Sequence, residues 1–193
     1  MRSKWRTLEK RRPKDKERHE AGPAKAGPVP YPFTPNDAAN RLLASDGTAL
    51  LIGLCLDQQV RTETAFEAPF RLRARIKTVA AAKVAALHPA SLAAAFRAKP
   101  ALHRYPGMMS KRVRALCAVI ARDYAGKGSS VWRGAKSADA AFERLCELPG
   151  FGRAKASCGV RILGKFGGIR LAGWERFGAD EDLPWVYENG RRL

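Results

Sequence analysis

The chain of 193 residues is long enough for one domain with a buried core, or for one domain of two lobes. It carries 36 lysine and arginine residues against 18 acidic ones, and the net charge of +18 predicts a polyanionic partner such as nucleic acid. No apolar run approaches the length of a membrane span and the N-terminus lacks the apolar core of a signal peptide, so we expect a cytoplasmic protein that has no membrane partner.

The first 27 residues are expected to form a basic, disordered tail. They contain ten lysine or arginine residues, four acidic residues and few apolar ones, and glycine-proline pairs near their end break regular structure. The tail either adds nonspecific phosphate contacts or has no task of its own. Residues 28–193 hold 26 basic and 14 acidic residues, so the predicted folded domain is itself basic.

Two helices are predicted at the start of the domain. Thr34 is expected to cap a helix that has Pro35 in its first turn and runs to about Ser45. The following run, Ala49–Leu56, is apolar without a polar interruption, which is the pattern of a central helix buried on all sides. This run ends abruptly at Asp57-Gln58-Gln59.

The middle of the chain is predicted to consist of further helices joined by short loops. A third helix is interrupted by Pro69, and alanine-rich helices follow at about 78–87 and 90–98. After the loop 103–107, Ser110 is expected to cap a helix with an apolar face made of Val113, Leu116, Cys117 and Ile120. No alternating strand pattern occurs, so the predicted fold class is all-α.

The cysteines are too widely spaced for a metal site. They stand at positions 55, 117, 146 and 158 without any Cys-x-x-Cys pair, and each lies in a predicted helix beside apolar neighbours. We therefore expect reduced, buried thiols and neither a metal ion nor an iron–sulfur cluster bound by them.

A helix-hairpin-helix is predicted at about 138–164, with the sequence Leu-Pro-Gly-Phe-Gly at its turn. Gly150 and Gly152 can adopt backbone angles closed to other residues and let a phosphate approach the backbone. The free N–H groups and the positive dipole end of the second helix then form an anion site, to which Arg153 and Lys155 add charge. Alternatively, the turn merely connects two helices.

Leu56-Asp57-Gln58-Gln59-Val60 ends the buried helix, and the hairpin turn 148–152 follows roughly ninety residues later. These two stretches, in this order, resemble the HhH-GPD superfamily of DNA glycosylases. The chain is most similar to the uncharacterised bacterial branch of HhH-GPD-type base excision repair proteins. Supporting stretches are Pro69 after Ala65-Phe66, the loop 103–108 and Gly173-Trp174, and the resemblance covers about residues 34–176.

The resemblance implies a two-lobed helical fold with a cleft that binds a base flipped out of double-stranded DNA. It implies a monomer in the bacterial nucleoid, and a monovalent cation held by carbonyls of the hairpin. Gln58 or Gln59 is expected to fill the gap left by the flipped base, although Gln58 could instead be hydrogen-bonded locally at the helix end. The DNA-binding residues implied in the hairpin are Gly150, Phe151, Gly152, Arg153 and Lys155.

The catalytic residues of the superfamily are not matched at their usual positions. The catalytic aspartate corresponds to Ala172, the glutamate of the adenine-specific branch to Leu54, and the lysine of bifunctional members to Ala154. Because Lys155 lies one step further and about 100° around the helix, no lyase reaction is expected.

Two acids could replace the missing aspartate, because cleavage of an N-glycosidic bond builds positive charge on the sugar. Asp57 ends an apolar helix, which favours a shifted pKa, but it could equally be a helix cap or an ion-pair partner of Arg61. Glu175 lies near the position of the missing aspartate, or is simply an exposed acid. His103 and Tyr105 either line the pocket or pack within their loop.

The sequence therefore supports two functions of different classes. The first is a monofunctional DNA glycosylase that removes an altered base, with Asp57 as the acid. The second is a non-catalytic DNA-binding protein that recognises lesions and has lost the reaction. An RNA-binding or ribosomal module is a third interpretation of the same positive charge.

Overall fold

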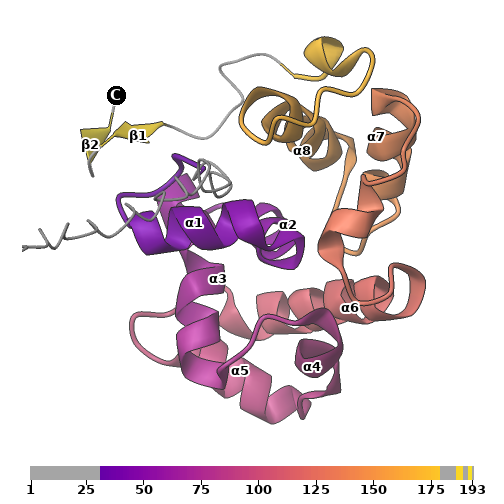
Figure 1. Ribbon diagram of the computed structural model, residues 1–193. Coiled ribbons are helices and arrows are strands. Elements are labelled where there is room, and N and C mark those ends of the chain that lie inside the picture. The colour runs from indigo at the N-terminus through magenta and orange to yellow at the C-terminus, as the bar shows by residue number, and fades with distance from the viewer. Residues whose placement is uncertain (1–30, 179–185, 189–190, 193) are drawn as a thin grey trace, which may run out of the picture.

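The computed structural model describes residues 31–178, 186–188 and 191–192, so the predicted tail at 1–27 lies outside the described residues. Helices dominate this part of the chain, which confirms the all-α prediction (Figure 1). The α-helices are α1 (Asp37–Ser45), α2 (Gly47–Leu56), α3 (Thr62–Ile76), α4 (Ala81–Ala86), α5 (Pro89–Arg97), α6 (Pro106–Asp123), α7 (Ala138–Cys146) and α8 (Arg153–Lys165).

Two short 3-10 helices and one pair of strands complete the described elements. The 3-10 helices are η1 (Gly128–Val131) and η2 (Trp174–Arg176), and the strands β1 (Tyr187–Glu188) and β2 (Arg191–Arg192) pair in antiparallel fashion. The strand pair differs from the prediction, because two residues per strand are too few to show an alternating pattern in the sequence. The backbone N–H of Tyr187 donates to the carbonyl of Pro32, 2.7 Å away, which joins the strand pair to the start of the domain.

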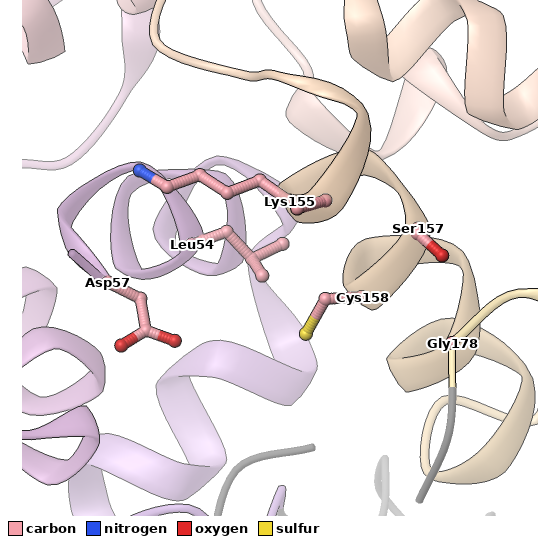
Figure 2. Close-up of a pocket in the computed structure, with 7 residues that line it drawn as sticks. Leu54, Asp57, Lys155, Ser157, Cys158 and Gly178 are labelled. Carbon is pink, nitrogen blue, oxygen red and sulfur yellow. The ribbon is translucent and has the colours of Figure 1, made fainter. Parts of the chain in front are cut away.

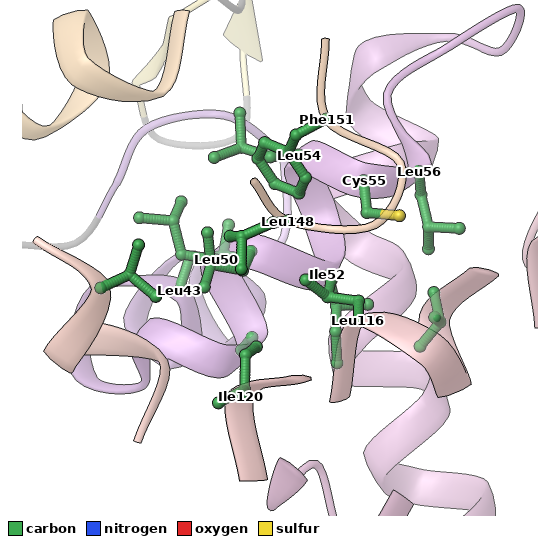
Figure 3. Close-up of a cluster of buried hydrophobic side chains, with 14 of the residues drawn as sticks. Leu43, Leu50, Ile52, Leu54, Cys55, Leu56, Leu116, Ile120, Leu148 and Phe151 are labelled. Atoms are coloured by element: carbon green, nitrogen blue, oxygen red, sulfur yellow. The ribbon is translucent and has the colours of Figure 1, made fainter. Parts of the chain in front are cut away.

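Helix α2 is the centre of the hydrophobic core, as its uninterrupted apolar run predicts. Every residue from Thr48 to Leu56 is buried, and α2 contacts α1, α3, α6, α8 and η1. Figure 3 shows its side chains in one cluster with Leu116 and Ile120 of α6 and with Phe151 of the hairpin. Burying one such leucine contributes about 1.5–3 kcal/mol, so the run fixes the position of α2 among its neighbours.

The segment between α6 and α7 docks closely against the start of α2. A Cβ atom added to Gly47 would lie 2.4 Å from the backbone nitrogen of Ser129, and one added to Gly128 would lie 2.5 Å from that of Thr48. The N–H of Gly128 also donates to the hydroxyl of Thr48 at 3.1 Å. The two backbones touch directly, so both positions require glycine.

The first helix begins two residues later than expected. Its N-cap is Asn36, whose side-chain oxygen accepts hydrogen bonds from the N–H groups of Ala38 and Ala39. Thr34 instead binds the side chain of Asn40 through both its N–H and its hydroxyl group, each at 3.0 Å. Thr34 therefore fixes the entry of the chain onto α1 and does not cap it.

A predicted interruption at Pro69 and a predicted N-cap at Ser110 both lie inside continuous helices. Pro69 cannot donate a backbone hydrogen bond, yet α3 continues through it, because Ala65, Ala68 and Leu72 are buried along both halves of the helix. Ser110 is not an N-cap, since α6 already begins at Pro106, and its hydroxyl donates to the carbonyl of Gly107 within the helix at 3.0 Å.

The helices form groups around α2 (Figure 1). Helices α4 and α5 pack on α6, while α7 and α8 pack on each other and α8 contacts α2. Among the described residues, none of the helices is long and apolar enough to cross a membrane. Cys55 and Cys117 are buried as expected, whereas Cys146 and Cys158 are only half-buried.

Candidate functional site

The predicted hairpin joins α7 to α8 and packs against α2 and α6. Gly150 has φ +87°, a left-handed conformation that favours glycine. A Cβ atom at this position would also lie 2.6 Å from Cδ of Arg112 and 3.1 Å from Sγ of Cys55. By contrast, Gly152 has an extended backbone (φ −104°, ψ 177°) that any residue adopts, and no heavy atom lies within 4 Å of an added Cβ. The fold therefore needs glycine at position 150 but not at position 152, which corrects the expectation for Gly152.

The first turn of α8 presents unpaired backbone donors. Gly152 is the N-cap and no side chain caps the helix; the first intrahelical bond runs from the N–H of Ala156 to the carbonyl of Gly152, at 3.0 Å. Within the described part of the chain, the N–H groups of residues 152–155 meet no acceptor. Gly152 and Arg153 are exposed, so an anion can reach these groups.

Phe151 has a different place from its neighbours in the hairpin. Its side chain is only 8 % exposed and belongs to the hydrophobic core. Its N–H donates to the carbonyl of Leu148, 3.0 Å away, and is therefore not available to a phosphate. Phe151 thus anchors the turn on the core while the donors that follow it face solvent.

The two glutamines that follow α2 occupy a turn whose backbone is hydrogen-bonded to the buried His103 side chain. Gln59 is exposed with φ +53°, whereas the side-chain nitrogen of Gln58 lies 3.1 Å from Sδ of Met109. The backbone carbonyl of Gln58 lies 3.0 Å from Nε2 of His103, and Nδ1 of His103 accepts from the N–H of Tyr105 at 3.0 Å. Because Nδ1 is an acceptor, Nε2 carries the proton and donates to Gln58.

His103 is a structural residue rather than part of a pocket wall. Its side chain is 2 % exposed, and burial lowers the pKa of its imidazole, which keeps the ring neutral. Tyr105 is 41 % exposed, and the guanidinium of Arg104 lies 4.9 Å from the centre of its ring. Tyr105 therefore lies on the surface and can stack against a planar group.

Met108 is not among the predicted site residues, although it is 50 % exposed, the most exposed of the large apolar side chains described. It precedes Met109, which is fully buried and contacts Gln58. The spacing from Val113 and Leu116 places Met109 on the buried face of α6 and Met108 outside it. That periodicity is the signal that could have identified Met108.

A pocket of about 300 Å³ lies between α2 and α8 (Figure 2). This volume is at the lower end of the range for small-ligand sites, which runs from about 300 to 1,000 Å³. We call it the Asp57 pocket, and its lining residues are Leu54, Asp57, Ala154, Lys155, Ser157, Cys158 and Gly178.

Asp57 is the acid of this pocket. It is half-buried at the C-terminal end of α2, and its Oδ1 accepts a 3.4 Å hydrogen bond from the hydroxyl of Thr62. Burial raises the pKa of the Asp57 carboxyl, whereas nearby Lys155 and the Thr62 hydroxyl act in the opposite direction. The pKa shift predicted for Asp57 is therefore present, and its main cause is loss of solvent.

Lys155 reaches the pocket from the other side. Its ammonium group donates to the carbonyl of Cys55 at 2.6 Å, and Figure 2 shows its side chain extending from α8 across the end of α2. Burial lowers the pKa of this amine. Although Lys155 and Ala154 lie about 100° apart on the helix, both line the pocket, because the lysine side chain is long.

The predicted ion pair between Arg61 and Asp57 is not formed, and the second predicted acid, Glu175, does not lie at the Asp57 pocket. Arg61 forms its ion pair with Glu63, at 3.3 Å, and not with Asp57. Glu175 is exposed in η2 and does not line the pocket; its carbonyl accepts from Arg161 at 2.9 Å. Glu63 lies outside the sequence motifs, yet it is only 8 % exposed and accepts from the Tyr187 hydroxyl. Its charge adds to the upward shift in the Asp57 pKa.

Comparison with known proteins adds no assignment. No protein-family model matches the chain, and no curated protein matches it.

Proposed function

We propose that this protein binds double-stranded DNA and releases an altered base by hydrolysis of its N-glycosidic bond. The observation that carries the proposal is the double role of the first turn of α8. Residues 152–155 offer unpaired N–H groups at the surface, and Ala154 and Lys155 of that turn line the Asp57 pocket. A phosphate bound at the helix end therefore lies beside the hollow into which its nucleotide can turn.

The charge of the chain supports a polyanionic ligand at this place. The protein carries a net charge of +18, and exposed Arg153 stands at the same helix end. Neutralising several phosphates releases counterions, so binding should weaken steeply as the salt concentration rises. In this proposal the fold is the two-lobed arrangement of HhH-GPD glycosylases, and the chain acts as a monomer.

Asp57 is proposed to act on the sugar of the flipped nucleotide. The leaving base takes electrons from the sugar, and a nearby carboxylate stabilises the positive charge that develops and orients the attacking water. Lys155, held on the carbonyl of Cys55, keeps a positive charge near Asp57 and so favours the ionised carboxylate. The proton removed from water passes to Asp57.

The glutamine turn is proposed to fill the space that the base leaves in the duplex. Extruding a nucleotide costs a few kcal/mol of stacking and pairing, and an inserted side chain recovers part of it. Gln59 is exposed at the tip of the turn, and His103 fixes the preceding carbonyl from within the core. Exposed Met108 and Tyr105 lie on the neighbouring segment and add apolar surface for the same purpose.

The alternative function is DNA binding without catalysis. It is favoured by Ala172 and Leu54, which stand where related enzymes carry acids, and Leu54 is buried and apolar. In this case the Asp57 pocket would hold a flipped base without cleaving it.

The test is a base-release assay on duplexes that contain uracil, alkylated purines or oxidised bases, scored as alkali-labile sites. We expect cleavage with the wild-type protein, loss of cleavage in Asp57→Asn with duplex affinity retained, and normal cleavage in Glu175→Gln as the matched control. Absence of cleavage across the panel with binding intact would establish the alternative. Cleavage that survives in Asp57→Asn would exclude Asp57 as the acid.

A further inference from the structure

A second hollow lies next to the Asp57 pocket, along the first turns of α8. It has a volume of about 340 Å³, and we call it the Phe142 groove. Its lining residues are Phe142, Arg153, Ala154, Ser157 and Phe177. Ala154 and Ser157 also line the Asp57 pocket, so one wall of α8 separates the two hollows.

Flat groups dominate the lining of the groove. The rings of Phe142 and Phe177 are 5.1 Å apart at an angle of 36°, and the guanidinium of Arg153 lies 4.8 Å from the centre of the Phe142 ring. Phe142 is only 6 % exposed, so Phe177 and the outer face of Arg153 provide the accessible planar surface. Unstacked bases in nucleic-acid complexes rest on aromatic rings and on guanidinium planes.

The charges of the groove fit a phosphodiester strand. Exposed Arg153 contacts no acidic side chain in the part of the chain that the structure describes, whereas Arg176 beside Phe177 is paired with Asp139. The unpaired N–H groups of residues 152–155 begin at Arg153's end of the groove. An apolar planar floor next to an exposed guanidinium and to backbone donors matches a base that is joined to a phosphate.

We infer that the Phe142 groove binds the base of the nucleotide adjacent to the one that enters the Asp57 pocket. The adjacent base leaves the duplex stack and rests on Phe177 and Arg153, while the phosphate between the two nucleotides meets the start of α8. This inference rests on the proposed function, because it takes the Asp57 pocket as the site of the flipped nucleotide. It makes the identity of the neighbouring base a determinant of affinity.

The experiment uses a duplex with a stable abasic-site analogue, which mimics the flipped nucleotide, and with 2-aminopurine placed on either side of it in turn. This base fluoresces more strongly when it leaves the base stack. With the wild-type protein we expect a fluorescence rise at one of the two flanking positions. Arg153→Lys keeps the charge but not the plane, and Phe177→Leu keeps the bulk but not the ring, so each should abolish the rise and weaken binding about 5- to 20-fold.

A matched pair on α3 serves as the control. Arg73 lies 5.9 Å from the ring centre of Phe70, outside both hollows, so Arg73→Lys and Phe70→Leu should leave the fluorescence and the affinity unchanged. Should Phe177→Leu fail to fold, the exposed Arg153→Lys carries the test alone. Absence of a rise at both positions, or a rise that persists in Arg153→Lys, would overturn the inference.

The assay separates this inference from the proposed function. If the protein prefers the abasic duplex to an undamaged one but neither flanking base responds, only the groove assignment is wrong. If the two duplexes bind equally and no base is released from the lesion panel, the proposed function is wrong, and the groove assignment is wrong with it.

Discussion

Replacing Gly152 with aspartate should stabilise the fold while weakening DNA binding. The backbone at this N-cap is extended, an added Cβ meets no atom within 4 Å, and no side chain caps α8. An aspartate there accepts from the free N–H groups and lies at the positive end of the helix dipole. The cap contributes a few tenths of a kcal/mol relative to glycine and the dipole about 0.3–1 kcal/mol. We therefore expect unfolding to cost about 0.5–1 kcal/mol more, which raises Tm by roughly 1–4 °C.

The same carboxylate would occupy the place of the DNA phosphate that we propose binds there. A hydrogen bond to a charged group contributes about 1.5–3 kcal/mol, so the loss of one such contact should weaken duplex binding at least ~10-fold. The slope of log K against log salt should also fall by about 0.9 for each phosphate contact that is lost. Stability and affinity thus move in opposite directions in a single variant.

Ala80→Asp is the matched control for the charge and the cap. Ala80 is the N-cap of α4, is exposed, and makes no side-chain cap bond, so an aspartate there adds the same charge at a helix start away from the hairpin. Thermal unfolding followed by circular dichroism and duplex binding followed by fluorescence anisotropy provide the two measurements. A Gly152→Asp protein that is stable and binds duplex DNA as the wild type does would refute the role of these N–H groups.

Three further predictions follow from the described contacts. Burial raises the pKa of Asp57, so the folded state disfavours the carboxylate. Asp57→Asn should therefore unfold at a higher temperature than the wild type at neutral pH. The difference in Tm should vanish in acid, where wild-type Asp57 is protonated. In urea unfolding, Gly150→Ala should destabilise the fold by about 1–2 kcal/mol because of its left-handed backbone, and further because of the contact with Arg112. Gly134 has φ +78° and open space around it, so Gly134→Ala should show only the backbone cost. Burial lowers the pKa of His103, so protonation favours the unfolded chain, and the free energy of unfolding of the wild type should fall as the pH drops through about 6.5. His103→Leu should lose about 1–3 kcal/mol of this free energy at neutral pH and should show a weaker decline in acid. An equal decline in both proteins would contradict this role of His103.

The apolar run that forms α2 and the glycine turn of the hairpin could be recognised from the sequence, because both patterns act locally. Burial of a helix on all sides requires an uninterrupted apolar run, and the left-handed backbone at Gly150 favours glycine. The pKa shift of Asp57 was also predictable, since a carboxylate at the end of such a helix loses solvent.

Features that depend on long-range contacts could not be predicted in the same way. The position of Lys155 across the end of α2 depends on how the hairpin docks, a hundred residues after Cys55. The Phe142 groove depends on a ring from beyond η2. Local propensity predicts an interruption at Pro69 and a helix start at Ser110, whereas tertiary packing keeps α3 and α6 continuous through these residues.

The direct backbone contact between the Gly47 and Gly128 segments has a consequence for the mobility of α7. It fastens the chain before α7 to one end of α2, while Gly150 and Lys155 fasten the chain after α7 to the opposite end of that helix. Because the chain is attached to α2 on both sides of α7, α7 has no single connection about which it can rotate. If duplex DNA binds as we propose, α7 and the hairpin turn keep their position on α2, and the bending needed for a close fit would be made by the DNA.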